Sequence, residues 1–409
     1  MSLYAEEIRF GWFLPTSGDG RYVGAAPERE PSLDYLIEVG QMAERSGFEF
    51  VLIPTGGACL DSWVVGSAVM SHTTRLNALV AVRPGLIAPV LAARMAASLD
   101  QLSGGRAMIN VVTGSSVQDL EQLGDPLAHA HDERYERAME YMQVMKLAWT
   151  GSAGSALSEF SGQAEPGSVA AADFFEGKYF QFHGPVHTPI AVQRPHPPLY
   201  LGGSSPIAKQ AAAQHADTYL MWGEPHEWIA GQIAEMEDIR KEVLRITGID
   251  RKPRYGLRAQ VLIRDTEEEA WAAAWSLISR ASSDTLEQAQ QSFAKTDAAN
   301  QSRQNELREQ SAASDFVIGP NLWSGLSLVR SGGAMLIVGT AEQVTDVLIR
   351  YAEIGISTFI LSGYPHLEEA ENFGQKVLPL FRKQWSQKNE SRGECGCVQL
   401  RLTLLDKEN

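Results

Sequence analysis

Two side chains that can exchange protons, Tyr364 and His366, follow directly after an apolar run in the segment 357–370, STFILSGYPHLEEA. Residues 358–361 have the composition of a strand buried on both faces, and a Ser-Gly turn ends it. A helical pattern of apolar residues begins at Leu367. The segment predicts a strand, a loop and a helix, with a phenol and an imidazole at the carboxyl end of the strand, where parallel α/β folds place their chemistry.

A guanidinium group occupies a second candidate strand. Residues 255–263 alternate between two faces, so Arg258 and Gln260 share one face. A charged side chain in an apolar strand needs a partner, and two kinds fit equally well: an anionic ligand or a neighbouring acid. The sequence leaves both interpretations open.

A glycine and serine turn follows the apolar run that ends at Leu201. Its residues Gly203, Ser204 and Ser205 would offer free peptide N–H groups, two hydroxyls and the positive end of a helix to a phosphate. The alternative interpretation is an ordinary turn with a serine N-cap.

Cys59 is a candidate nucleophile, a pocket wall or a small buried apolar residue. No histidine lies near it in the sequence to activate the thiol, so we predict a pocket wall. Paired carboxylates, HExxH, GxSxG and Walker sequences are absent, which argues against the commonest hydrolytic functions. Cys395 and Cys397 lack a third ligand, and no metal site is predicted.

Eight apolar segments read as strands and mostly alternate with helical patterns, which predicts a parallel sheet closed into a (β/α)8 TIM barrel. A doubly wound open sheet is the alternative, but no GxGxxG follows the first segment. The segments are 8–14, 48–54, 76–83, 107–113, 198–202, 218–222, 255–263 and 358–362. The clearest helical patterns span 32–46, 89–102 and 132–149.

Two long insertions interrupt this alternation within one barrel domain at 1–384. The first, at 151–185, combines a Gly, Ser and Ala rich loop with a hairpin arm at 178–183. The second, at 282–320, is rich in Gln, Ser and Ala. Loops of this length fit a lid over the barrel mouth, and tolerated surface decoration is the simpler alternative. Residues 385–409 form a polar tail in which 398–404 alternates like an edge strand.

The composition limits the partners of the chain. Its 409 residues are 44% hydrophobic and carry a formal net charge of -15, which argues against nucleic acids and anionic membranes. Neither a signal peptide nor an apolar run long enough for a membrane span is found, so a cytoplasmic protein is expected.

The ends of the predicted strands collect polar and aromatic residues that a barrel would bring to one mouth. Such a mouth suits a planar phosphorylated cofactor better than a metal ion. The residues are Trp12, Ser17, Thr55, Cys59, Arg83, Asn110, Thr113, Ser204, Ser205, Trp222, Arg258, Gln260, Tyr364 and His366.

With these residues placed, the chain resembles the flavin-dependent alkanesulfonate monooxygenases of the bacterial luciferase-like superfamily. The resemblance covers roughly residues 8–381 and depends on several ordered segments: WFLPTSGDGRY, VLIPTGGACLDSW, RMAASLDQLSGGRAMINVVTG, HDERYERA, PPLYLGGSS, LMWGEP, GPNLWSG and LSGYPHLEEA. It implies a (β/α)8 barrel, reduced FMN from a separate NAD(P)H-dependent FMN reductase, and dioxygen as co-substrate. It also implies release of sulfite and an aldehyde from an organosulfonate, and a homo-oligomer, either dimer or tetramer.

The resemblance also implies roles for individual residues. Cys59, Trp222, Arg258, Tyr364 and His366 would form the catalytic set. The expected FMN contacts are Asn110, Thr113, Tyr135, Gly203, Ser204 and Ser205, and the expected substrate contacts are Ser17, Gln260, Trp12 and Trp323.

Three departures from the family pattern bear on the substrate. Ser17 stands where the family has a histidine, in SGDG, and Gln260 replaces another. The family's basic lid segment is SAAS at 311–314, which leaves Arg303 or Arg308 as replacements. Because serine and glutamine pair well with hydroxyl groups, we expect a polyhydroxylated sulfonate such as sulfoquinovose. The alternatives are a simple alkanesulfonate monooxygenase, a flavin-binding protein without turnover, and a deazaflavin-dependent dehydrogenase.

Overall fold

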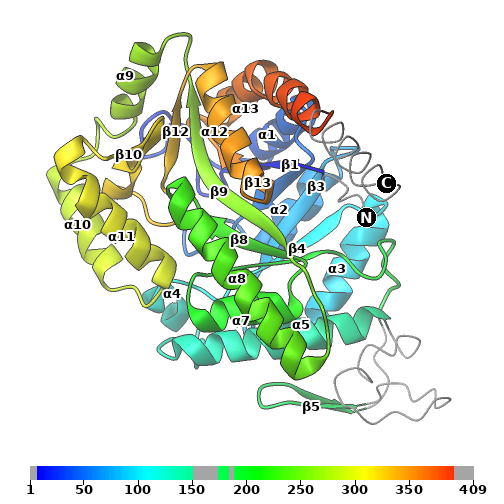
Figure 1. Ribbon diagram of the computed structural model, residues 1–409. Helices are drawn as coiled ribbons and strands as arrows, with labels where there is room; N and C mark the ends of the chain where they lie inside the picture. Colours follow the sequence, from blue (N-terminus) through cyan, green and yellow to red (C-terminus); the bar gives the residue numbers. More distant parts are fainter. Residues whose placement is uncertain (1–6, 151–173, 184–187, 391–409) are drawn as a thin grey trace, which may run out of the picture.

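The computed structural model describes residues 7–150, 174–183 and 188–390. Within them, eight parallel strands close into a barrel with helices around it (Figure 1). In order around the barrel the strands are β1 (Arg9–Phe13), β2 (Phe50–Ile53), β3 (Asn77–Val82), β4 (Ala107–Val111), β7 (Leu199–Gly202), β8 (Thr218–Trp222), β9 (Arg254–Ile263) and β13 (Ile356–Ser362). All eight predicted strands are confirmed.

The barrel closes because its last strand in the sequence, β13, pairs with its first, β1. Strand β13 pairs with both β1 and β9, and β8 pairs with β9, so the sheet has no free edge in the barrel. The (β/α)8 prediction is therefore confirmed, and the open doubly wound sheet is wrong.

Helices cover the outer surface of the barrel, and the three that the sequence marked most clearly are confirmed. They are α1 (Leu33–Arg45), α3 (Pro89–Ser103) and α5 (His131–Thr150). The others are α2 (Ser62–Met70), α4 (Val117–Gln122), α7 (Pro206–His215), α8 (His226–Thr247), α9 (Glu267–Leu277), α12 (Ala341–Glu353) and α13 (His366–Lys376). Among the described residues, none of the helices has the length and apolar character needed to cross a membrane.

Strand β9 is longer than its neighbours and pairs with three strands of the same sheet. Its first part pairs with β8 and β13, whereas 260–263 pairs with the unpredicted strand β12 (Leu336–Gly339). Two further strands, β11 (Leu322–Trp323) and β10 (Val317–Gly319), extend β12 in antiparallel fashion. Short strands joined by turns carry too weak a periodicity to be seen in the sequence.

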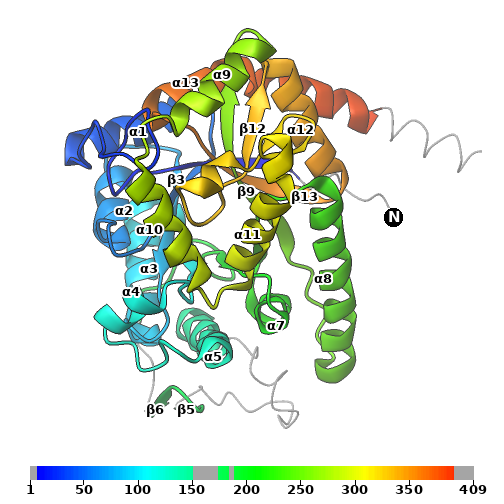
Figure 2. The same ribbon diagram turned by 90° about the vertical axis from the view of Figure 1, so that its left-hand side faces the viewer.

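The second insertion is a helical hairpin, so its prediction as a long loop is wrong. It contains α10 (Ser283–Ala294), α11 (Ala299–Ser311) and the short 3-10 helix η3 (Ala312–Ser314). Its N-cap Ser282 accepts a hydrogen bond from the Thr285 N–H. Phe293 and Leu307 are the large apolar side chains that the hairpin buries. Because these two are so few, the sequence shows no clear helical period. Figures 1 and 2 show both helices together at one end of the molecule.

The other irregular segments are described only in part. Residues 151–173 lie outside the described range. A hairpin is present, with strands β5 (Phe174–Glu176) and β6 (Gln181–His183), and the predicted bounds 178–183 include only its second strand. A last helix covers 378–390, so the start of the predicted tail at 385–390 is helical. The predicted edge strand and both tail cysteines fall outside the described residues.

One buried histidine gives this fold a testable acid sensitivity. His215 ends α7, and burial, with the nearby Lys146 and Arg251 charges, lowers its pKa from 6.5 to about 3. Between these values the unfolded chain binds a proton that the folded protein does not, so stability falls as pH drops below 6.5. We expect His215→Gln to remove about 2 kcal/mol of the stability difference between pH 7.5 and pH 5 in urea unfolding. The exposed His72→Gln is the control, and equal pH dependence in all three proteins would contradict the assignment.

Candidate active site

A cavity of about 300 Å³ opens at the carboxyl ends of the barrel strands. This volume is at the lower end of the range for small-molecule sites. Strand residues form its floor, and Tyr135 on α5, Asn300 on α11 and the loop 330–333 form its rim. The predicted residues that line it are Thr55, Asn110, Thr113, Tyr135, Trp222 and Arg258.

The Arg258 guanidinium is buried in the wall of this cavity and has no carboxylate partner among the described residues. Its Nη2 donates to the Ser362 hydroxyl at 2.7 Å, and its Nη1 donates to the Ala259 carbonyl at 2.5 Å. Burial lowers its pKa from the ordinary value to about 9, and the positive charge of Arg330 contributes. Within the described residues the salt-bridge interpretation is therefore wrong, and the group is available to an anionic ligand.

Arg330 is a second guanidinium in the same cavity, and it was not predicted from the sequence. It follows the 3-10 helix η4 (Gly325–Leu328), in the loop before β12. Its Nη1 donates to the Tyr364 hydroxyl, and no carboxylate among the described residues pairs with it. The ring of Phe13 contacts both groups, 4.8 Å from Arg258 and 5.9 Å from Arg330. The sequence RSGG at 330–333, a charge before two glycines, was the only available signal.

The opposite wall is built from the ends of β4 and β7. The Tyr135 hydroxyl donates to the Gly202 carbonyl at 3.2 Å, and burial raises the pKa of this tyrosine, so it remains a protonated donor. The Tyr219 hydroxyl donates to the next carbonyl, that of Gly203, at 2.6 Å. Two tyrosines thus fix the turn after β7 through its carbonyl oxygens.

The glycine and serine turn deviates from the prediction in detail. Gly202 lines the cavity, whereas Gly203, Ser204 and Ser205 do not. Gly203 has φ +142°, and a Cβ there would lie 2.3 Å from the Tyr135 hydroxyl oxygen, so only glycine fits. The Ser205 hydroxyl caps α7 by accepting the Ala208 N–H. The N-cap interpretation is confirmed, and a phosphate site here remains a prediction.

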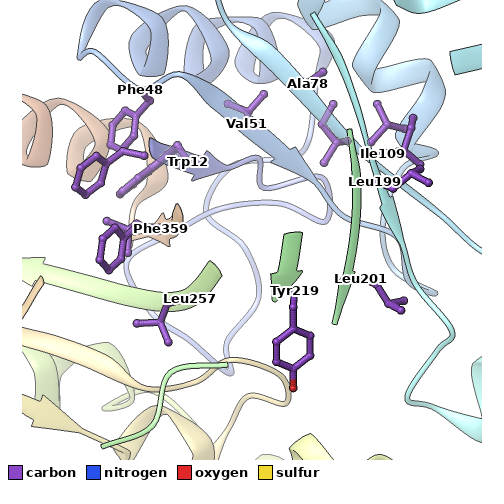
Figure 3. Packing of buried hydrophobic residues seen from close by; sticks show 14 of the residues in the cluster. Trp12, Phe48, Val51, Ala78, Ile109, Leu199, Leu201, Tyr219, Leu257 and Phe359 are labelled. Carbon is purple, nitrogen blue, oxygen red and sulfur yellow. The ribbon is translucent and has the colours of Figure 1, made fainter. Parts of the chain in front are cut away.

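The two tryptophans predicted to contact the substrate, Trp12 and Trp323, lie in the protein core and do not line the cavity. Trp12 alternates with Phe13 along β1 and points outward, where it packs on Phe48 with ring centroids 5.0 Å apart (Figure 3). Trp323 packs on Trp275 at 5.1 Å in a separate cluster under α9. A strand places successive residues on opposite faces, and β1 uses Phe13 for the cavity.

Three other predicted residues also lie off the cavity. Ser17 is exposed in the loop after β1. Gln260 is buried, donates to the Gly333 carbonyl at 2.8 Å and accepts from the Ser362 hydroxyl, so its amide is engaged inside the protein. Cys59 is half-buried after β2 and is not part of the cavity wall, to which Thr55 contributes instead.

Tyr364 and His366 lie close together, as predicted, but behind the cavity wall. Their rings meet edge to face at 5.0 Å, and the His366 ring is 5.8 Å from Phe13. Tyr364 reaches the cavity through Arg330, and His366 is bound to the carboxylate of Asp19.

The hairpin α10–α11 is attached to the barrel by two ion pairs close to the cavity. Arg303 donates twice to the buried Glu224, at 2.7 and 2.6 Å, and Arg134 donates twice to Asp297, at 2.8 and 2.7 Å. Ala298 and Asn300, next to Asp297, line the cavity. This hairpin therefore covers part of the barrel mouth, as the lid interpretation expected, with Arg303 as an attachment to the barrel.

We expect Glu224→Gln to loosen this hairpin. A neutral amide cannot accept both Arg303 N–H groups and the Gln232 amide N–H with the strength of a carboxylate, and hydrogen bonds to a charged group contribute about 1.5–3 kcal/mol. Limited proteolysis within 282–311 should accelerate roughly tenfold. Glu306→Gln on the exposed face of α11 is the control, and equal cleavage rates would show that Glu224 does not hold the hairpin.

Arg308, the other suggested lid residue, donates to the Asn305 side chain and the Ser327 carbonyl and is not part of the cavity.

Groups of three or more His, Cys, Asp or Glu side chains suited to a metal ion do not occur among the described residues. The cavity thus offers cations, amides, hydroxyls and aromatic rings for binding.

Comparisons with known proteins agree with this architecture. Residues 8–358 match the family model described as luciferase-like monooxygenase. The fold is similar to that of an EDTA monooxygenase from Chelativorans sp. BNC1 (TM-score 0.71, 20% identity, 92% of this chain and 94% of that chain). It also resembles a long-chain alkane monooxygenase (0.69, 22%, 94% and 92%) and a riboflavin lyase with modified FMN and riboflavin (0.66, 23%, 92% and 92%). Because the family model spans most of the sequence, the chain belongs to the luciferase-like monooxygenase family.

Proposed function

We propose that this protein is a reduced-FMN-dependent monooxygenase that cleaves the C–S bond of an organosulfonate. The balanced reaction converts the sulfonate RCH2SO3⁻, dioxygen and reduced FMN into the aldehyde RCHO, bisulfite, oxidised FMN and water. The observation that carries the proposal is the pair Arg258 and Arg330: two guanidiniums face one cavity, and no described carboxylate neutralises either. A sulfonate would supply the missing negative charge.

The other side of the cavity has the features expected of a flavin site. Asn110, Thr113 and Tyr135 bring an amide and two hydroxyls to the ends of β4 and α5, and the glycine at 202 allows a close approach to the backbone. When bound, reduced FMN would supply the electrons that activate dioxygen. The residues of this chain would bind and orient it through Asn110, Thr113 and Tyr135, as the resemblance implies.

Within this proposal the two guanidiniums hold the sulfonate oxygens and remain in place as charge develops on the leaving sulfite. Trp222 and Phe13 line the same cavity and exclude water from it. The hairpin α10–α11, held by Glu224 and Asp297, would complete this exclusion over the mouth.

The size of the substrate is a separate question. The expected preference for a sulfo-sugar depended on Ser17 and Gln260, and neither residue lines the cavity. Asn110 and Asn300 do line it and can pair with hydroxyl groups. We therefore keep sulfoquinovose as one arm of the test beside simple alkanesulfonates.

The proposal is tested by a sulfite-release panel with FMN, NADH and a flavin reductase. Sulfoquinovose, octanesulfonate and methanesulfonate are compared at equal concentration, and sulfite from at least one is expected. A higher kcat/KM for either alkane would reject the sugar preference. Bound FMN without sulfite from any of the three would favour a flavin-binding protein, and turnover with a deazaflavin would favour the dehydrogenase.

Two partners belong to the same proposal. Reduced FMN would come from an NAD(P)H-dependent FMN reductase, and the resemblance favours a homo-oligomer. Light scattering would separate a dimer from a tetramer and would reject the proposed oligomer if it gave a monomer.

A further inference from the structure

The SGDG segment that contains Ser17 also contains a buried carboxylate, Asp19, whose role the proposed reaction does not explain. Both of its oxygens are surrounded by donors. Oδ1 accepts the Gly20 N–H at 2.8 Å and faces His366 Nδ1 at 2.8 Å. Oδ2 accepts the His366 backbone N–H at 2.8 Å and the Tyr35 hydroxyl. Burial opposes its ionisation, but these hydrogen bonds hold the pKa of Asp19 below its ordinary value.

An ionised carboxylate with no proton of its own fixes the histidine tautomer. Because Asp19 can only accept, the proton of the neutral imidazole must be on Nδ1, and Nε2 is left as an acceptor. Nε2 of His366 is buried and has no hydrogen-bond partner among the described residues. A buried acceptor without a donor is costly, which is a reason to expect that a donor arrives with a ligand.

The position of the ring is fixed as firmly as its tautomer. His366 is the first residue of α13, and Asp19 accepts its backbone N–H, which places a negative charge at the helix amino terminus. The indole N–H of Trp12 donates to the His366 carbonyl at 3.0 Å. The ring therefore cannot turn away from Phe13 and Tyr364, the two aromatic residues that contact the guanidiniums of Arg258 and Arg330.

We propose that Asp19 is a positioning residue that holds His366 in the Nδ1–H tautomer, so that Nε2, behind the cavity wall, is left as a proton acceptor. The proposal rests on the function proposed above. Formation of the aldehyde removes one hydrogen of the CH2 carbon as a proton while the electrons of that C–H bond enter the C=O bond, with reduced FMN and dioxygen as the oxidising system. Because His366 does not line the cavity, Nε2 would receive this proton through a bridging water and return it to solvent.

Titratable or charged groups surround the ring on both sides. Asp19, Tyr35 and Arg29 form a chain on the carboxylate side, in which Arg29 donates to the Tyr35 hydroxyl at 3.2 Å. Tyr364 and Arg330 lie on the cavity side. Two matched variants change this hydrogen-bonded series of residues. Asp19→Asn reverses the polarity of the contact with Nδ1, and Tyr35→Phe removes a donor to the carboxylate but keeps the carboxylate.

The first measurement is two-bond proton–nitrogen NMR on the full chain with ¹⁵N-labelled histidine, with His366→Asn to assign the signals. It needs neither flavin nor substrate. In mildly alkaline buffer the wild type should show a protonated Nδ1 and a bare Nε2 at His366. Asp19→Asn should move the proton to Nε2, because its amide N–H₂ now faces Nδ1, and Tyr35→Phe should leave the tautomer unchanged. A wild type with its proton on Nε2 overturns the proposal without any variant.

The second measurement is steady-state turnover of a sulfonate by the same proteins. Asp19→Asn should lower kcat roughly 100-fold with little change in sulfonate KM, and Tyr35→Phe should have a much smaller effect. A changed tautomer with unchanged kcat would overturn the role of Nε2. If the wild type releases no sulfite, the proposed function fails, while the NMR result still decides whether Asp19 sets the tautomer.

Discussion

Arg258→Ala should lower kcat/KM for the sulfonate by roughly 100- to 1000-fold, about 3 kcal/mol or more of transition-state stabilisation, in the sulfite-release assay. The side chain is buried in the cavity wall, donates to Ser362 and has no described acid to neutralise it. Arg258→Lys should recover little, because an ammonium cannot present the same fork of donors to a sulfonate.

The same substitution should leave the protein folded. A buried guanidinium whose pKa is lowered to about 9 destabilises the fold, so Arg258→Ala should keep or raise the melting temperature while activity is lost. Arg245→Ala, on the exposed face of α8, is the matched control and should change neither property. Near-normal sulfite release by Arg258→Ala, or loss of activity only through unfolding, would assign Arg258 a structural role.

Arg330→Ala should raise the KM for the sulfonate roughly 10- to 100-fold, since a hydrogen bond to a charged group contributes about 1.5–3 kcal/mol. Arg330 is half-buried on the cavity rim, and its partner is the neutral Tyr364 hydroxyl, so its charge remains available to a ligand. The measurement is the dependence of sulfite release on sulfonate concentration at saturating reduced FMN.

Tyr364→Phe separates the two possible roles of this contact. If Tyr364 only orients Arg330, its loss should raise KM less than Arg330→Ala does, and the double variant should be no worse than Arg330→Ala alone. Arg330→Lys keeps the charge and should fall between the wild type and the alanine variant. An unchanged KM in Arg330→Ala would leave Arg258 as the sole anion-binding group.

The fold was predictable because each barrel strand is a short apolar run followed by a helical pattern. Strand β13, for example, is buried throughout, and Tyr364 and His366 follow it as expected. The helices of the insertion 282–320 could not be predicted, because most of their residues are polar and few apolar side chains are buried. Helix propensity and N-caps were the only local signals, and they are weak.

The site was predicted in part for a related reason. Arg258 was found because a charge in an apolar strand is conspicuous, whereas Arg330 is in a loop and reaches the cavity only through the chain fold. Trp12 was expected at the cavity because it is near the end of a strand, but its side chain points outward and packs on Phe48. Asp19 and His366 are 347 residues apart, and local sequence patterns carry no signal of their contact.

The most direct test of the proposed function is a single-turnover reaction without any reductase. FMN is reduced photochemically in the absence of oxygen, mixed with the protein and a sulfonate from the panel, and then exposed to dioxygen, after which sulfite and hydrogen peroxide are measured. We predict sulfite formed in step with the reduced FMN consumed, and its loss in Arg258→Ala. One hydrogen peroxide formed per reduced FMN oxidised, with no sulfite from any sulfonate, would contradict the proposed function.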